Sequence, residues 1–188
     1  SHISESNQRM ILLVNSILDV SRIELSTFVA DVRPTDIFLL TEDVVTESKH
    51  LIESKQLILH KNYNQSVGIV NIDSRYVRMI LENLLSNAIK YTPSGKSIDI
   101  TIARKGTSLH ITVADTGYGI PEEDVSKIFT KLFRASNILT KDTDGNGLGL
   151  YIIKSIVDYA GGKISFTSVE NEGTTFYVVL PIVNVKKN

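Results

Sequence analysis

Two glycine-rich clusters and one asparagine-lysine stripe hold the residues of this chain that could do chemistry. The first cluster is Asp115-Thr116-Gly117-Tyr118-Gly119-Ile120-Pro121, and the second is Asp144-Gly145-Asn146-Gly147-Leu148-Gly149-Leu150. Upstream, Asn83, Asn87 and Lys90 recur at helical spacing. Because glycine destabilises helices and strands, its density beside acidic residues indicates a backbone that approaches a ligand closely. With amide oxygens and a lysine nearby, the pattern predicts a site for a nucleotide and its phosphates.

The stripe of Asn83, Asn87 and Lys90 falls on one side of a predicted helix, away from its apolar side. Two amide oxygens and an ammonium group on one strip suit a Mg²⁺–phosphate cluster. The reason is that Mg²⁺ prefers oxygen ligands and is completed by water and substrate phosphates. A solvated polar helix face is the alternative interpretation of the same stripe.

The glycine clusters each follow a different logic. Asp115 ends a predicted strand, where its carboxylate could accept a hydrogen bond from an exocyclic amine such as that of adenine. A tight turn stabilised by an aspartate is the alternative. The second cluster opens a helix, and helix N-termini bind phosphates through unpaired N–H groups. It is neither a Walker loop, since Gly-Lys-Ser/Thr is absent, nor a Rossmann fingerprint, since no strand leads directly into it.

Composition narrows the class of protein. The 188 residues are 42% hydrophobic and 22% charged, which fits one soluble globular domain. The net charge of −1 gives no reason to expect nucleic acid or an anionic membrane as a partner. There is no cysteine, which excludes disulfides and thiolate metal sites. No signal peptide and no apolar run near the roughly 20 residues of a membrane span are visible, so we expect a cytoplasmic location.

The first predicted element is a helix over residues 3–25 with a wide apolar stripe that includes Met10, Val14 and Ile17. Such a stripe is typical of a bundle helix with neighbours on more than one side. We expect the partner helix to come from another segment or molecule, with weak self-association through this helix. A terminal helix folded onto its own domain is the alternative.

The remaining elements alternate between helices and strands. Periodicity predicts helices over 36–54, 73–91, 121–129 and 147–159, and strands over 29–33, 57–61, 67–72, 97–104, 108–115, 163–169 and 174–180. Residues 130–144 are polar and predict a long loop. The pattern predicts an α/β two-layer sandwich, in which helices pack on one face of a mixed sheet.

In this order, the motifs resemble the catalytic ATP-binding domain of sensor histidine kinases, in the GHKL superfamily. The N box matches residues 82–92, the G1 box 115–121, the F box 128–134, the G2 box 145–150 and the last glycine motif 172–176. The resemblance covers 35–188 as the catalytic domain. Residues 1–26 resemble the second helix of the family's dimerisation and histidine phosphotransfer hairpin, which leaves 27–34 as a linker.

The resemblance implies ATP and Mg²⁺ as ligands. It assigns Mg²⁺ to Asn87 and Asn83, phosphates to Lys90 and Arg134, and the adenine amine to Asp115. Tyr91 would flank the nucleotide, and Thr175 would lie on its base side. The other residues that it places in the ATP site are Gly117, Gly119, Ile120, Phe129, Gly145, Gly147, Leu148 and Gly149. The glycines of the G2 box would let a lid over 130–146 fold onto the phosphates, and Leu132 departs from the F box, which usually has an aromatic residue there.

The implied function is transfer of the γ-phosphoryl group of Mg·ATP to a histidine, followed by relay to an aspartate of a response regulator receiver domain. The acceptor would lie on the family's hairpin, in cis or in trans. In this chain none of His2, His50, His60 and His110 is followed by an acidic residue as the family's acceptor is. We therefore expect ATP binding without self-phosphorylation, and we assign no catalytic residue. Whether the parent protein is anchored to a membrane is left open.

Two other classes of function remain. Hydrolytic GHKL ATPases carry a glutamate general base where Asn83 stands here, and an amide cannot take a proton from water. Glu82 is adjacent but points about 100° away on the helix. A degenerate module that binds nucleotide only to set its conformation is the third class, and the intact motifs argue against it.

Overall fold

The structure, a computed structural model, describes residues 30–138 and 147–183. Its helices are α2 (Ile37–Ser54), α3 (Ser74–Tyr91) and α4 (Gly149–Tyr159). Its strands are β1 (Arg33–Asp36), β2 (Ile58–Asn62), β3 (Ile69–Ile72), β4 (Ser97–Lys105), β5 (Ser108–Asp115), β6 (Lys163–Val169) and β7 (Gly173–Pro181). Short 3₁₀ turns cover Gln65–Val67, Glu122–Asp124 and Ser136–Ile138.

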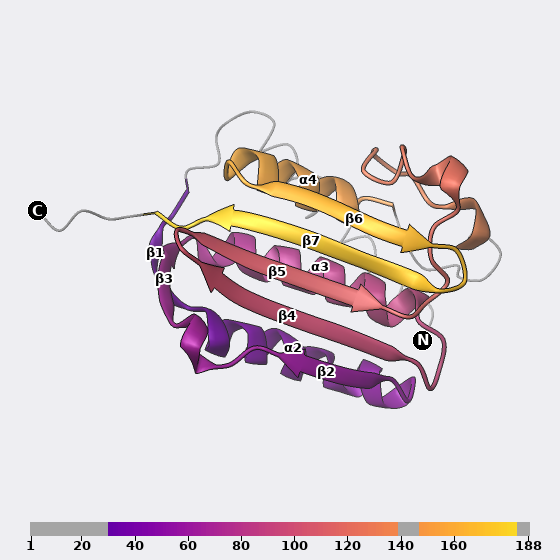
Figure 1. The fold of residues 1–188 in the computed structure, drawn as a ribbon, viewed down its shortest axis with the longest axis horizontal. Coiled ribbons are helices and arrows are strands. Elements are labelled where there is room, and N and C mark those ends of the chain that lie inside the picture. The colour runs from indigo at the N-terminus through magenta and orange to yellow at the C-terminus, as the bar shows by residue number, and fades with distance from the viewer. Residues whose placement is uncertain (1–29, 139–146, 184–188) are drawn as a thin grey trace, which may run out of the picture.

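These elements form two layers. One layer is a five-stranded sheet in the order β2-β4-β5-β7-β6, where β2 pairs parallel to β4 and the other pairs are antiparallel. The helices α2, α3 and α4 all lie on one face of this sheet (Figure 1). The predicted two-layer α/β sandwich with a mixed sheet is confirmed. A second small sheet, in which β1 pairs with β3, lies at one end of the molecule (Figure 1).

The core forms where the alternating apolar residues of the strands meet the helices. Ile98 and Ile100 of β4, and Ile111 and Val113 of β5, are at most 1% exposed. Helix α3 contributes its wide apolar side to the same core, including Leu84. Helices α2 and α3 begin at aspartate caps, because the Asp36 carboxylate accepts the Leu39 N–H at 3.0 Å and the Asp73 carboxylate accepts the Arg75 N–H at 3.0 Å.

Some predicted boundaries are wrong. The strand expected over 29–33 is instead β1, which begins at Arg33 and pairs with β3 outside the main sheet. Residues 121–129 do not form the expected α-helix. The N–H groups of Asp124, Val125 and Lys127 instead donate to the carbonyls three residues back, so the segment is a series of tight turns. Helix α4 begins at Gly149, two residues later than expected. The predicted helix over 3–25 and residues 139–144 of the predicted loop lie outside the described residues.

The carboxyl end of α3 is held by a lysine from α2. The ammonium group of Lys55, which follows the last residue of α2, donates to the carbonyl oxygens of Ile89 at 2.7 Å, Lys90 at 2.8 Å and Thr92 at 3.2 Å. These carbonyls lack partners within the helix, and a cation is favourable at the negative end of the helix dipole. The contact therefore fixes the end of α3 that carries Lys90 and Tyr91.

Replacing Lys55 by methionine should lower the free energy of unfolding by about 1–3 kcal/mol, because hydrogen bonds to a charged group are lost at partly buried carbonyls. Urea denaturation measures the change. The matched control is Lys49→Met within α2, because the Lys49 ammonium group is 3.7 Å from Glu53 and its side chain is 69% exposed. The control should stay within about 0.5 kcal/mol of the parent chain. Equal effects of the two substitutions would contradict this role of Lys55.

Candidate functional site

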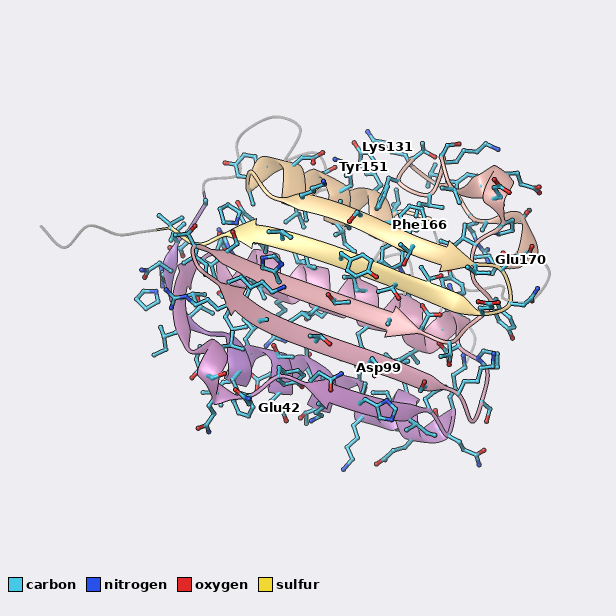
Figure 2. All side chains as sticks on the ribbon, in the orientation of Figure 1. Glu42, Asp99, Lys131, Tyr151, Phe166 and Glu170 are labelled. Atoms are coloured by element: carbon cyan, nitrogen blue, oxygen red, sulfur yellow. The ribbon has the colours of Figure 1, made fainter. Side chains whose placement is uncertain are left out.

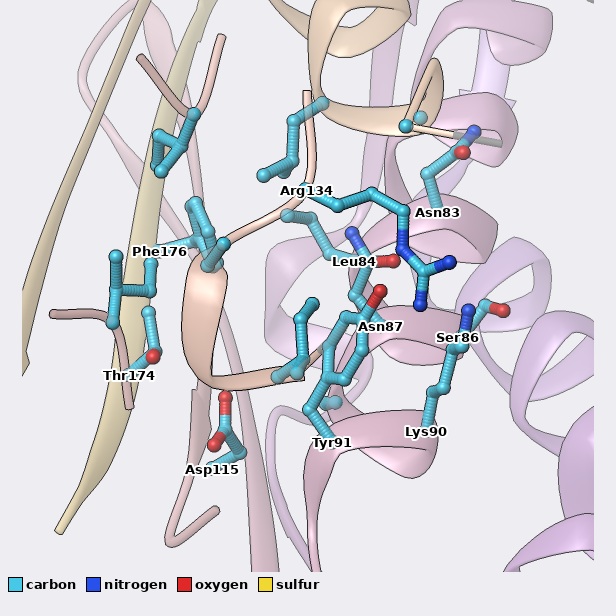
Figure 3. A pocket seen from close by; sticks show the side chains of 18 of the residues that line it. Asn83, Leu84, Ser86, Asn87, Lys90, Tyr91, Asp115, Arg134, Thr174 and Phe176 are labelled. Carbon is cyan, nitrogen blue, oxygen red and sulfur yellow. The ribbon is translucent and has the colours of Figure 1, made fainter. Parts of the chain in front are cut away.

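A cavity opens between α3, the end of β5 and the start of α4 (Figure 3). It brings together residues from the asparagine stripe, both glycine clusters and the segment after Ile128. The predicted site residues that line it are Asn83, Asn87, Lys90, Tyr91, Asp115, Gly119, Ile120, Arg134, Gly147 and Gly149. Motifs separated by up to 66 positions in the sequence thus contribute to one pocket.

Four predicted site residues do not line this cavity. Thr175 is not among the lining residues, since successive strand residues face opposite sides of a sheet and Thr174 and Phe176 are the residues of β7 that face the pocket. Leu148 is 5% exposed and packs in the hydrophobic core. The Gly117 N–H donates to the Asp115 carboxylate. Phe129 packs against Phe166, which in turn stacks on Phe176 of the cavity lining. Gly145 lies outside the described residues.

The sequence-based prediction also missed the apolar lining. Alternation along β5 puts Val113 on the same face as Asp115, and the period of α3 puts Leu84 and Ala88 beside the asparagine stripe. These signals were present but were interpreted as core alone. The other lining residues that the prediction missed are Ser86, Ile128, Phe133, Ala135, Ile138, Leu150, Ile152, Thr174 and Phe176.

Asp115 marks one end of the cavity (Figure 3). Its carboxylate accepts the Gly117 N–H at 2.8 Å, and the backbone N–H of Thr174 also donates to it. Burial raises the pKa of Asp115 to about 6, against the opposing effects of these two hydrogen bonds and of Lys96. At pH 7 and above the group is therefore mainly an ionised acceptor in apolar surroundings, which suits a ligand with an amino group.

The loop after Asp115 packs closely against the turn between β6 and β7. Gly119 has φ +65°, and a Cβ there would overlap the carbonyl group of Val169. From the other side, a Cβ at Gly173 would overlap the carbonyl oxygen of Asp115. The Asn171 N–H donates to the Tyr118 carbonyl at 2.7 Å across the same contact. Glycine is therefore required here for close backbone approach.

The opposite end of the cavity is polar and positively charged. The Asn83 amide nitrogen donates to the Met79 carbonyl at 2.8 Å, which leaves its oxygen turned toward Gly149, where a Cβ would lie 2.8 Å from it. Figure 3 shows the Arg134 guanidinium group between Asn87 and Ser86. Lys90 lies on the same side, with its ammonium group 5.1 Å from the centre of the Tyr91 ring. Amide groups and two cationic side chains thus line this end of the cavity, which suits a ligand with anionic groups.

Aromatic side chains support the wall between these ends. Phe129 meets Phe166 edge-on with ring centres 5.8 Å apart, and Phe166 stacks on Phe176 at 5.7 Å. The F-box segment is also joined to α4, because the Lys131 ammonium group lies 4.9 Å from the centre of the Tyr151 ring (Figure 2). The middle of the cavity wall is therefore apolar, and the polar groups lie at its two ends.

Comparisons with known proteins agree with this geometry. Residues 72–184 match the family model described as histidine kinase-, DNA gyrase B-, and HSP90-like ATPase. The chain is 33% identical over 181 residues to the circadian input-output histidine kinase CikA of Synechococcus elongatus, covering 95% of this chain and 24% of that protein. The chain therefore spans about a quarter of the length of this curated relative.

Solved structures show the same fold. The nucleotide-free catalytic domain of the histidine kinase ThkA has a TM-score of 0.69 and 29% identity, covering 80% of this chain and 95% of that chain. Full-length ShkA, solved in complex with AMPPNP, has a TM-score of 0.83 and 24% identity, covering 97% of this chain and 38% of that chain. The chain therefore belongs to the histidine kinase-, DNA gyrase B-, and HSP90-like ATPase family, and its domain is of the ATP-binding kind found in sensor histidine kinases.

Proposed function

We propose that the cavity binds Mg·ATP with the adenine at the Asp115 end and the phosphates at the end formed by Asn83, Asn87, Lys90 and Arg134. One observation supports this most directly: a partly buried carboxylate and a pair of cations occupy opposite ends of a single cavity with an apolar wall between them. A base needs the first end and the wall, and a triphosphate needs the second end.

The residues present fit a Mg²⁺ ion that arrives with the nucleotide. Within 30–138 and 147–183 no group of three or more His, Asp or Glu side chains is placed to hold a metal by itself. Asn87 and Asn83 would supply amide oxygens, and phosphate oxygens and water would complete the shell. When bound, the ion would neutralise charge on the phosphates. Lys90 and Arg134 would orient the phosphate groups beside it.

We infer that the domain transfers the γ-phosphoryl group to a histidine. Such transfer depends mainly on positioning and charge neutralisation, and this cavity offers both. His50, His60 and His110 do not line the cavity. Residues 1–26 resemble one helix of the family's hairpin, and the acceptor histidine would lie on the other helix of that hairpin. Relay to the aspartate of a receiver domain would follow in the cytoplasm. The chain would then consist of a hairpin helix over 1–26, a linker over 27–34 and a catalytic domain over 35–188. Weak dimerisation would occur through residues 3–25.

Hydrolysis is the alternative, and the position of Glu82 argues against it. Glu82 is exposed on α3, where its carboxylate lies 3.4 Å from Arg78, and it does not line the cavity. Asn83, which does line it, cannot act as a general base. None of the described helices is long and apolar enough to cross a bilayer.

Asp115→Ala should weaken ATP binding at least about tenfold, or roughly 1.4 kcal/mol, because the base loses its partly buried acceptor. Calorimetric titration with and without Mg²⁺ measures this, and the parent chain should show one site with tighter binding in Mg²⁺. Asp99→Ala is the matched control, because Asp99 does not line the cavity and its carboxylate lies 3.2 Å from His60 on β2. Unchanged affinity of the Asp115→Ala variant would contradict the base site.

ATP affinity should also fall at low pH. Because the pKa of Asp115 is raised to about 6, the carboxylate is ionised above that pH and becomes protonated below it. At about pH 5 the ionised fraction falls to roughly a tenth, and affinity falls by a similar factor. The ratio of the dissociation constants of Asp115→Asn and the parent chain, measured from pH 8 to 5, isolates this effect from protonation of the phosphates. A ratio that stays constant would exclude a role for Asp115 ionisation.

Steady ATP hydrolysis should be slow and should not depend on Glu82. The substitution Glu82→Ala leaves the cavity lining intact and removes only the contact with Arg78. A coupled assay of ADP release should therefore give the same low rate for both proteins. A substantial rate that disappears in the Glu82→Ala variant would favour the hydrolytic class instead.

A further inference from the structure

The hydroxyl group of Ser168 joins three backbone or side-chain groups at the base end of the cavity. Ser168 lies near the end of β6, one residue before the turn that packs on the loop after Asp115; Glu170 in Figure 2 marks this turn. Its oxygen is 2.9 Å from the Ile120 nitrogen, 3.0 Å from the Gly173 carbonyl oxygen and 2.9 Å from the Thr174 hydroxyl oxygen. Ile120 and Thr174 line the cavity, whereas Ser168 does not.

The chemistry of the three partners determines which group is the donor in each hydrogen bond. A hydroxyl group has one proton to donate and can accept two hydrogen bonds. The Ile120 N–H can only donate and the Gly173 carbonyl can only accept, so Ser168 accepts from the first and donates its proton to the second. Its remaining lone pair faces the Thr174 hydroxyl, which must therefore be the donor in the third contact.

The direction of this hydrogen bond determines what Thr174 can offer to a ligand in the cavity. Thr174 is 7% exposed, and its single hydroxyl proton points at Ser168, so only lone pairs remain for a ligand. Thr174 also pairs directly with Asp115 across β5 and β7, and both side chains stand at the same end of the pocket (Figure 3). Two neighbouring groups at this end then accept hydrogen bonds, and neither side chain donates one.

We propose that Ser168 is a positioning residue that fixes the Thr174 hydroxyl as an acceptor and so favours bases with an amino group over bases with an oxo group at the same ring position. This inference rests on the proposed function, in which the base lies at this end. An oxo group brings lone pairs toward Asp115 and Thr174, and a buried pair of facing acceptors is unfavourable. An amino group supplies the donors that both residues require.

The test compares ATP with inosine triphosphate, which carries an oxo group where ATP carries an amino group. Dissociation constants are measured by calorimetry at pH 8, where Asp115 is ionised, for the parent chain and for Ser168→Ala. Alanine removes the acceptor of the Thr174 proton, so this hydroxyl can rotate and donate to an oxo group. The preference for ATP over inosine triphosphate should fall at least about fivefold. Asp115 should preserve part of it.

Two further variants separate positioning from loss of structure. Ser165→Ala, on the exposed side of the same strand, should leave the preference unchanged. Thr174→Val removes the hydroxyl itself and should lower the preference, with no further fall in the double variant Ser168→Ala/Thr174→Val. If Ser168→Ala does not fold, Thr174→Val alone decides, and an unchanged preference in it overturns the proposal.

The outcomes distinguish this proposal from the one on which it rests. If the parent chain binds neither nucleotide, the proposed function fails and the role of Ser168 fails with it. If the parent chain binds ATP and Ser168→Ala weakens both nucleotides equally, Ser168 supports the loop but does not set the direction of the Thr174 hydroxyl. That result would overturn only the present inference.

Discussion

The Asp115 end of the cavity depends on one backbone contact, between the loop after Asp115 and the turn that joins β6 to β7. Strands β5 and β7 pair as far as Asp115 and Thr174, and beyond that point the two chain segments stay in contact through Gly119 and Gly173. A side chain at either glycine would overlap a carbonyl group. The site requires this close approach of the two backbone segments, because it places the acceptor groups of two strands next to each other.

Helix α3 connects this contact to the other end of the cavity. One side of the helix packs in the core and another carries the asparagine stripe, so core packing also sets the position of the polar groups. Its carboxyl end is tied twice: Lys55 binds three carbonyls there, and the Tyr91 carbonyl accepts the Tyr118 N–H at 3.1 Å. The second tie joins the helix to the loop after Asp115, so helix α3 supports both ends of the cavity.

The strongly periodic parts of the fold could be predicted from the sequence, and the register of single residues could not. The stripe of α3 and the hairpin of β4 and β5 follow from periods of 3.6 and 2. Thr174 and Thr175 are chemically alike, and although alternation with Phe176 puts Thr174 on the buried face, the resemblance assigned Thr175 to the site. Leu148 sits among glycines in the sequence, yet its apolar side chain is buried. The turns over 121–129 depend on a tertiary contact, since the Asp124 carboxylate accepts the Ser136 N–H at 2.6 Å.

The same geometry supports the proposal of phosphoryl transfer over that of hydrolysis. The side chains at its polar end are amides and cations, which hold phosphates but do not take a proton from water. The adjacent carboxylate, Glu82, is turned outward to Arg78 by the period of the helix. A site of this kind stabilises charge on a phosphoryl group while leaving the choice of nucleophile to whatever molecule reaches it. Specificity for the acceptor would then reside in docking, and specificity for the nucleotide would reside in the Asp115 and Thr174 acceptors at the other end of the cavity.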